Sequence, residues 1–226
     1  MRIRTTPLAL LILLLALAPS LHAQNDEGKG VKSDPKANKL LAELKKANDQ
    51  AKTVKASFTK TLEMRGSDRK PIQMSGTLEM QGVKFRLDME DQLVVNDGTH
   101  MWSFLKEEQE IMKSEYDEET GFSPERLFTF SQKDMKAQYN ERVLMNGSYH
   151  DKITLYPKSG NYEYFKVELW LDAKRHMPAK AKQWNRNGSV VTYTISDLQV
   201  NPGLPASRFS FDPGQYPDAE VIDNTF

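Results

Sequence analysis

The alternation of apolar and polar residues is strongest between Ile72 and Met89. One parity of its first half carries apolar residues or glycine: Ile72, Met74, Gly76, Leu78 and Met80. After a break at Gln81-Gly82 the same pattern resumes with Val83, Phe85, Leu87 and Met89. Because successive side chains of a strand point to opposite faces, this stretch predicts a hairpin with one apolar and one polar face. A helix would scatter these residues around its axis.

The same period of two recurs along most of the chain. It starts at Val54–Met64 and continues through Leu93–Val95, Met101–Leu105, Ile111-Met112, Met135–Met145, Ile153–Leu155, Phe165–Leu171, Ala179–Gln183, Val191–Ile195 and Phe209–Phe211. Tight turns are predicted at Asn96-Asp97-Gly98, Asn146-Gly147 and Asn187-Gly188, since glycine accepts a positive φ without strain. We expect ten or eleven strands in an antiparallel sheet, with the last strand at Phe209–Phe211. A sheet of this length can curl into a barrel.

Two helices interrupt the strand pattern. LLAELKKANDQAKTV follows Asn38 and has one narrow apolar side, and either Asp34 or Asn38 could cap it. A second, aromatic-rich helix is predicted from Ser123 to Phe130, with serine as its cap and proline in its first turn.

The N-terminal sequence and the composition suggest an exported protein. Residues 1–23 are expected to form a signal peptide, because Arg2 and Arg4 precede an apolar run and Leu21-His22-Ala23 fits a cleavage site. The run from Leu8 to Ala18 is shorter than the ~20 residues that cross a bilayer. Residues 24–37 are expected to be flexible, and residues 38–226 to form one domain.

Charge and cysteine content limit the partners and the cellular compartment that we expect. The chain has 31 basic and 31 acidic residues, so loss of the leader's two arginines leaves a net charge of 29 − 31 = −2. This balance gives no electrostatic reason to expect nucleic acid as a partner. The absence of cysteine favours a bacterial periplasm over a disulfide-rich secreted domain, and excludes a lipid-modified cysteine.

Motifs that carry chemistry are absent from the sequence. His100, His150 and His176 lie far apart and form no zinc-binding pattern, and no nucleotide loop or nucleophile elbow occurs. Asp97 and Asp172 lie at predicted turns, where aspartate bonds its own backbone. We therefore expect no catalytic residue, no metal and no cofactor.

Two features of the apolar faces allow alternative interpretations. Lys60 interrupts the apolar parity of its strand, and either reaches water at a rim or is a functional charge inside a cavity. Seven methionines lie on predicted strands: Met64, Met74, Met80, Met89, Met101, Met112 and Met145. Flexible methionines could line a cavity for acyl chains or simply fill gaps in a core.

Several short strings occur in the order typical of one protein family. They are KASFTKTLEM, GTLEM, KFRLDM, an Asp-Gly-x-x-x-Trp hairpin (Asp97 to Trp102), and the closing RFSFDPGQYPDAEVID. In these strings, from about Asn38 to Asp223, the chain resembles the LolA family of periplasmic outer-membrane lipoprotein carriers. Better-known members have an Arg-Pro pair after the Gly-x-Leu strand, whose arginine ties the helical lid to the barrel. This chain has Gln81-Gly82 there.

The resemblance implies a mainly β fold, a strongly curved antiparallel sheet forming an incomplete β-barrel covered by helices. It also implies acylated lipoproteins as cargo, an inner-membrane ABC transporter as donor, an outer-membrane receptor such as LolB, and no cofactor. We expect a periplasmic monomer. The residues expected to contact acyl chains share the predicted inward parity or the second helix: Phe58, Leu62, Met74, Leu78, Met80, Phe85, Leu87, Met89, Trp102, Phe104, Leu127 and Phe128.

Three other functions fit the sequence. A protein of the same fold could sense lipids or lipoproteins without transporting them. An exported hydrolase or isomerase could use the cavity as a substrate pocket, with Asp97, His100 or Glu163 as candidates. A structural β-domain would have a filled core.

Overall fold

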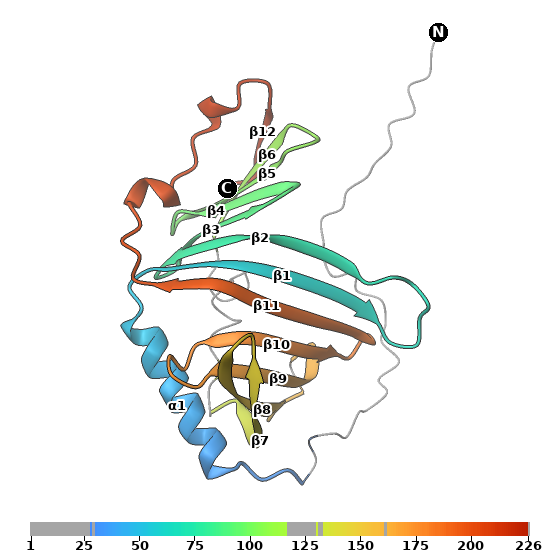
Figure 1. Cartoon of the computed structure of the whole chain (residues 1–226). Coiled ribbons are helices and arrows are strands. Elements are labelled where there is room, and N and C mark those ends of the chain that lie inside the picture. The colour runs from blue at the N-terminus through green and yellow to red at the C-terminus, as the bar shows by residue number, and fades with distance from the viewer. Residues whose placement is uncertain (1–27, 29, 117–129, 131–132, 161, 226) are drawn as a thin grey trace.

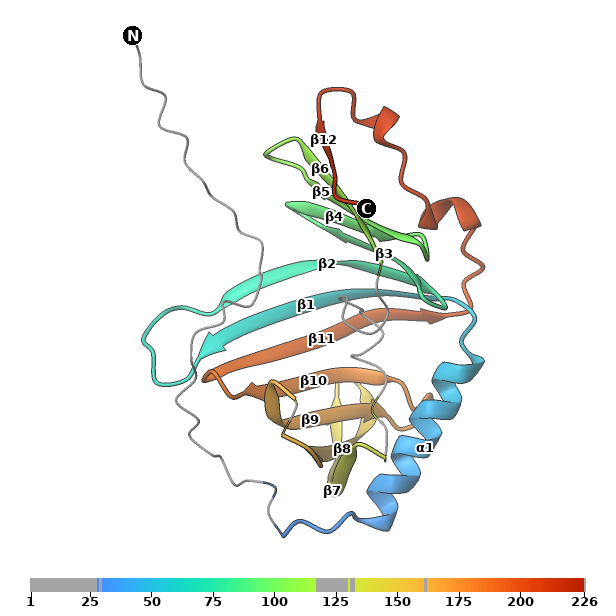
Figure 2. The same cartoon turned by 180° about the vertical axis from the view of Figure 1, so that it is seen from behind.

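The computed structural model describes residues 28, 30–116, 130, 133–160 and 162–225. In these residues one sheet of twelve strands runs in the order β12-β6-β5-β4-β3-β2-β1-β11-β10-β9-β8-β7. The sheet curves strongly across its width (Figures 1 and 2). The predicted mainly β fold with a curved antiparallel sheet, an incomplete barrel, is therefore confirmed.

Eleven of the twelve strands fall into two halves that meet at one seam, and β12 (Glu220–Asp223) pairs with the edge of the first half. The first half contains β1 (Val54–Met64), β2 (Ile72–Gln81), β3 (Lys84–Met89), β4 (Gln92–Asn96), β5 (His100–Leu105) and β6 (Glu110–Glu115). The second contains β7 (Met135–Met145), β8 (Ser148–Pro157), β9 (Tyr164–Asp172), β10 (Pro178–Asn185) and β11 (Ser189–Val200). Within each half, neighbours in sequence are neighbours in space. The halves are joined where β1 pairs with β11, from Val54 opposite Val200 to Met64 opposite Ser189.

The predicted hairpin is confirmed: β2 and β3 pair from Gly76 opposite Met89 to Gln81 opposite Lys84. Gly82 adopts φ +58° in the turn between them. Asn146 and Gly147 have φ +50° and +77°, the left-handed pair that the predicted tight turn requires.

The single α-helix of the described residues, α1 (Pro35–Gln50), begins directly after Asp34, one of the two predicted caps. Asp34 is its cap, because the carboxylate accepts hydrogen bonds from the backbone N–H groups of Lys36 (2.7 Å) and Ala37 (3.4 Å). Pro35 fits the first turn, whose N–H groups have no partner within the helix. Pro35 to Ala37, expected in the flexible segment, are thus helical, and Ala37 is fully buried.

The predicted last strand at Phe209–Phe211 is wrong. Residues Ala206–Phe209 form the 3₁₀-helix η2, and Pro213–Gln215 form a second one, η3. The last strand is instead β12 (Glu220–Asp223), which pairs in parallel with β6. Two prolines, Pro205 and Pro213, flank the region and lack the N–H that a strand ladder needs. The four residues of β12 are too few to show a clear alternation in the sequence.

Candidate functional site

The two faces of the sheet are covered at opposite ends. We call the face on which α1 packs the inner face. Buried leucines of α1 (Leu40, Leu41 and Leu44) contact the inner side chains of β7–β10, among them Ile153 and Leu169. At the other end of the sheet, the C-terminal segment covers the outer face of β4–β6.

The inner face of β1–β5 carries an apolar cluster that contains no residue of α1. Its buried members are Leu78, Phe85, Leu87, Met89 and Val94. Phe58, Met74, Met80, Met101, Tyr116 and Ile195 pack against them and keep part of their surface exposed. This half of the inner face, which we call the apolar half-face, is the candidate site.

Eight of the residues predicted for acyl-chain contact lie on the inner face, as the strand register shows: Phe58, Leu62, Met74, Leu78, Met80, Phe85, Leu87 and Met89. Leu62 lies opposite Ile72 and Val191, and is partly exposed. Gly76 lies between Phe58 and Met89 on the same face, and its lack of a side chain leaves room for both. The register therefore brings these eight side chains onto one surface.

The expectation that Trp102 and Phe104 share this face is wrong. Trp102 lies opposite Val95, which lies opposite Arg86, so all three point to the outer face. Phe104 follows two residues later on the same side. The sequence could not decide this, since Met101-Trp102-Ser103-Phe104-Leu105 is largely apolar on both parities. Leu127 and Phe128, the two candidates from the second predicted helix, lie outside the described residues.

Methionine is concentrated on the inner face. By register, six of the seven methionines noted on predicted strands lie there: Met64, Met74, Met80, Met89, Met101 and Met112. Met145 lies on the outer face. Because a methionine side chain is unbranched and adapts to irregular partners, this face can fit chains of variable shape.

Lys60 lies in the middle of β1, between Met74 of β2 and Tyr193 of β11 on the inner face. Burial lowers the pKa of Lys60, and burial raises the pKa of Tyr193. The backbone of Lys60 is thus not at a rim of the sheet. Its ammonium lies on a stem that starts within the apolar face, and a function for that charge stays a prediction.

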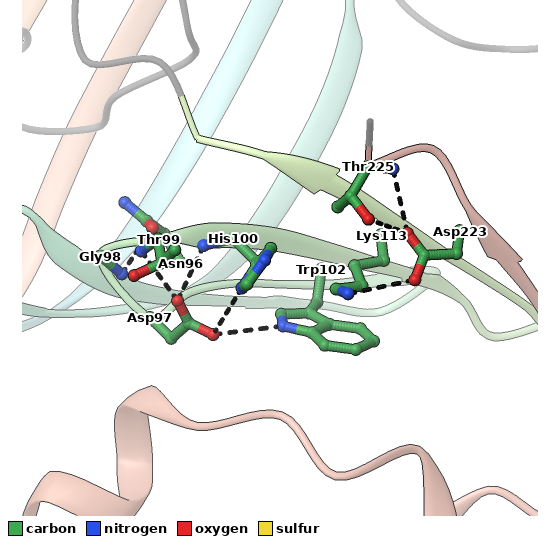
Figure 3. Close-up of polar contacts among 9 residues, drawn as sticks. All are labelled: Asn96, Asp97, Gly98, Thr99, His100, Trp102, Lys113, Asp223 and Thr225. Atoms are coloured by element: carbon green, nitrogen blue, oxygen red, sulfur yellow. Dashed lines mark hydrogen bonds and ion pairs between the residues drawn. The ribbon is translucent and has the colours of Figure 1, made fainter.

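Hydrogen bonds to the Asp97 side chain stabilise the turn between β4 and β5 (Figure 3). The Asp97 carboxylate accepts hydrogen bonds from the backbone N–H of Thr99 (2.9 Å) and of His100 (2.8 Å), and from the indole N–H of Trp102 (3.4 Å). Burial alone would raise the pKa of Asp97, but these hydrogen bonds outweigh it and lower the pKa. Asn96, fully buried, donates to the carbonyl of Val83 at 2.7 Å and so joins this hairpin to the β2–β3 turn.

The Trp102 ring is where distant motifs of the chain meet. Phe211 stacks on it with a centroid distance of 5.3 Å, and the ammonium of Lys113 lies 5.5 Å from its centroid. Lys113 also pairs with Asp223 of β12 at 3.1 Å (Figure 3). Hydrogen bonds from Thr225, then from Lys113, lower the pKa of Asp223 to about 2. One cluster of contacts therefore joins three motifs of the sequence: the Asp-Gly-x-x-x-Trp hairpin, the Phe-x-Phe segment and the closing Val-Ile-Asp string.

A second cluster, made of ion pairs, holds η2 against the sheet. Glu79 is 2% exposed on the outer face of β2, and its carboxylate lies 2.6 Å from Arg208 Nε and 3.0 Å from Lys55 Nζ. Burial alone would raise the pKa of Glu79, but hydrogen bonds and charge from Arg208 and Lys55 outweigh it and lower the pKa. Arg86, the arginine nearest to the family's Arg-Pro position, also points to this outer face. It therefore does not reach the inner face.

The described part of the chain offers little for metal chemistry or membrane insertion. It contains no group of three or more histidine, aspartate or glutamate side chains placed to hold a metal ion. None of its helices is long and apolar enough to cross a membrane.

Comparison with known proteins gives one consistent family. The family model described as "Outer membrane lipoprotein carrier protein LolA" matches residues 49–212. An outer-membrane lipoprotein carrier protein of Dechloromonas aromatica (strain RCB) is 26% identical over 166 residues, which are 72% of this chain and 78% of the relative. One of Bordetella avium (strain 197N) is 22% identical over 203 residues, 88% of this chain and 90% of the relative.

Among solved structures, an uncharacterized conserved protein from Thermus thermophilus has a similar fold, with a TM-score of 0.55 at 11% identity. The match covers 84% of this chain and 99% of that chain. At this identity the likeness concerns the fold alone.

Proposed function

The chain belongs to the LolA family of outer membrane lipoprotein carrier proteins, and on that premise we propose that it binds the acyl chains of lipoproteins on the apolar half-face. We further propose that it works in the periplasm, taking its cargo from an inner-membrane transporter and delivering it to an outer-membrane receptor. The resemblance seen in the sequence motifs is confirmed by the family match. The transport steps, the partners and the leader peptide at residues 1–23 are parts of the proposal.

One observation carries the proposal: the apolar half-face lies on the side of the sheet where α1 packs, but α1 covers only the other half. Phe58, Leu62, Met74 and Met80 keep part of their surface exposed there. A fully packed core would bury these side chains. An acyl chain laid over them would supply the missing contacts.

The physical chemistry of the cargo sets limits on such a surface. Burying one methylene contributes ~0.8 kcal/mol, so a 16-carbon chain contributes roughly 12 kcal/mol in total. A cargo with several chains cannot cross water unshielded, yet a surface that captured all of this energy would not release it. Flexible methionines and a partly buried lysine give an apolar but imperfect fit.

A matched pair of variants tests the proposal. Met74 and Ser75 are neighbours on β2 that point to opposite faces, Met74 inward and Ser75 outward. We expect Met74→Asp to abolish binding of a fluorescent fatty-acid probe and release of lipoprotein from inner-membrane vesicles. Ser75→Asp adds the same charge and should preserve both activities.

The two assays also separate the carrier from its alternatives. Probe binding without lipoprotein release would indicate a sensor of the same fold. Absence of both activities in the wild-type protein, or equal losses in the two variants, would refute the carrier proposal. We expect no catalytic turnover; a turnover that is lost when Asp97, His100 or Glu163 is replaced would support the enzyme instead.

A further inference from the structure

The outer face of β8–β10 carries a regular array of lysine and tryptophan, which we call the lysine–tryptophan face. It consists of Lys152, Lys166, Glu168, Trp170, Lys180, Lys182 and Trp184. It lies on the side of these strands opposite α1, whose leucines pack on the inner face. Part of its spacing is visible in the sequence as Lys180-x-Lys182-x-Trp184, but only the sheet register adds the lysines of β8 and β9.

Each indole lies between two lysines from neighbouring positions of the sheet. The ammonium groups of Lys152 and Lys180 lie 4.9 and 5.0 Å from the centroid of Trp170. Those of Lys166 and Lys182 lie 4.3 and 5.3 Å from the centroid of Trp184. Trp170 is only 9% exposed, and Trp184 is half-buried. The tryptophans therefore hold the ammonium groups in place rather than protrude themselves.

The face concentrates positive charge on a chain that is neutral as a whole. Four lysines and one glutamate give a formal charge of 4 − 1 = +3, and Glu141 of β7, which lies opposite Lys152, lowers it to +2. The full sequence has 31 basic and 31 acidic residues. Glu168 pairs with Lys152 at 3.1 Å. Asp172, the next acid on the same parity, is held by the N–H groups of its own turn and by Arg175 at 3.4 Å. It does not neutralise the array.

No described helix shields this face. The 3₁₀-helix η2 lies against β3, which β2, β1 and β11 separate from β10 (Figure 1). On the neighbouring outer surface of β1 and β2, Thr59 hydrogen-bonds to Ser75 and Gln73 to Thr61, and the charged residues are Lys55, Glu63 and Glu79. The positive charge is thus local to one end of a polar sheet surface.

We propose that the lysine–tryptophan face docks the protein on the surface of a bilayer that contains anionic phospholipid. All four cations are lysines, which act as point charges, whereas arginine is the residue suited to forked pairing with individual carboxylates of a protein partner. Fixed ammonium groups on a sheet face suit the many equivalent headgroups of an anionic bilayer surface. The inference goes beyond the carrier role and does not depend on it.

Vesicle sedimentation tests this docking with the full protein and no lipoprotein present. The protein should bind vesicles of phosphatidylcholine with phosphatidylglycerol, and not vesicles of phosphatidylcholine alone, with binding that weakens as salt rises. Lys180→Gln combined with Lys182→Gln should lower the affinity about 25-fold, since each lysine contributes about fivefold. This double variant keeps the Lys152–Glu168 pair. Arginine at both positions should retain the binding.

The control removes the same charge elsewhere. Lys39→Gln with Lys45→Gln changes two lysines of α1 whose side chains are 76% and 73% exposed, and should lower the affinity less than about twofold. Equal losses in the two double variants, or equal binding to both kinds of vesicle, would overturn the proposal. The proposal would also be overturned if the protein did not bind vesicles while lipoprotein delivery still depended on Lys180 and Lys182. The lysine–tryptophan face would then bind an acidic protein. Binding of the fatty-acid probe, measured in parallel, tests the carrier proposal separately.

Discussion

Replacing Glu79 by glutamine should loosen the C-terminal segment. The change keeps the shape of the side chain and removes the charge that holds Arg208 and Lys55. A hydrogen bond to a charged group contributes ~1.5–3 kcal/mol, so the two contacts together contribute roughly 3–6 kcal/mol before solvent is considered.

Solvent reduces this value. The side chains of Arg208 and Lys55 are each 41% exposed, so water screens them and can solvate them when Glu79 is neutral. A glutamine can also still accept one hydrogen bond. We therefore expect Glu79→Gln to lower the free energy of unfolding by about 2 kcal/mol, or Tm by roughly 4–8 °C for a domain of this size.

Urea unfolding at neutral pH measures the change, with Glu63→Gln as control because Glu63 is an exposed carboxylate on the same outer face. Amide hydrogen exchange should rise in Ala206–Phe209 for both Glu79→Gln and Arg208→Ala. A double-mutant cycle between the two positions should give a coupling of about 1–2 kcal/mol. If Glu79→Gln lowered the free energy of unfolding no more than Glu63→Gln does, the stabilising role of the Glu79 ion pairs would be refuted.

The same pair predicts a pH dependence. Because the pKa of Glu79 is lower in the folded protein, its contribution is present above its ordinary value of 4.5 and is lost as the pH falls through the folded value. The difference in stability between wild type and Glu79→Gln should thus be constant near neutral pH and shrink in acid. A difference that persists unchanged in strong acid would contradict the assigned charge.

Three further changes follow from the structure. Gly76→Ala should lower the free energy of unfolding by about 1–3 kcal/mol, because the new methyl would collide with the carbonyl of Asp88. Gly160→Ala, whose methyl would meet nothing within 4 Å, is the control, and equal urea midpoints for the two variants would contradict the close packing. Lys60→Met should raise the free energy of unfolding by about 1 kcal/mol and tighten binding of the fatty-acid probe. The gain in stability should shrink at alkaline pH, because the wild-type amine becomes neutral there. Weaker probe binding would show that the charge assists the ligand. Asp34→Ala should cost ~1 kcal/mol in a thermal melt followed by circular dichroism, and an unchanged Tm would contradict its role as the cap of α1.

Strand positions could be predicted where one parity was clearly apolar and a turn signal followed. The β2–β3 hairpin met both conditions, and its six predicted contact residues fell on one face as a result. The face of β5 could not be predicted, because both its parities carry large apolar side chains. The cover of that outer face comes from Phe211 and Tyr216, more than a hundred residues later in the chain.

Other parts of the site depended on long-range contacts. Nothing near Glu79 in the sequence points to Arg208, and only the folded chain brings them within 2.6 Å. Conversely, the assignment of Asp97 to a turn was predictable, because aspartate before glycine bonds the following backbone N–H groups locally. Its contact with the Trp102 indole gives a physical reason for the spacing of the Asp-Gly-x-x-x-Trp motif.

The seam between β1 and β11 has a consequence for how the protein reaches its native state. Val54 needs Val200 as its partner, so the central strand of the sheet stays half-paired until nearly the whole chain is available. A polypeptide threaded through a membrane from its N-terminus would expose Phe58 and Leu62 to water throughout that passage. Pairings this distant in sequence form slowly, and the unfinished edge can join other chains. Under the export proposed above, the open edge of β1 would therefore stay available to other chains until residue 200 has emerged.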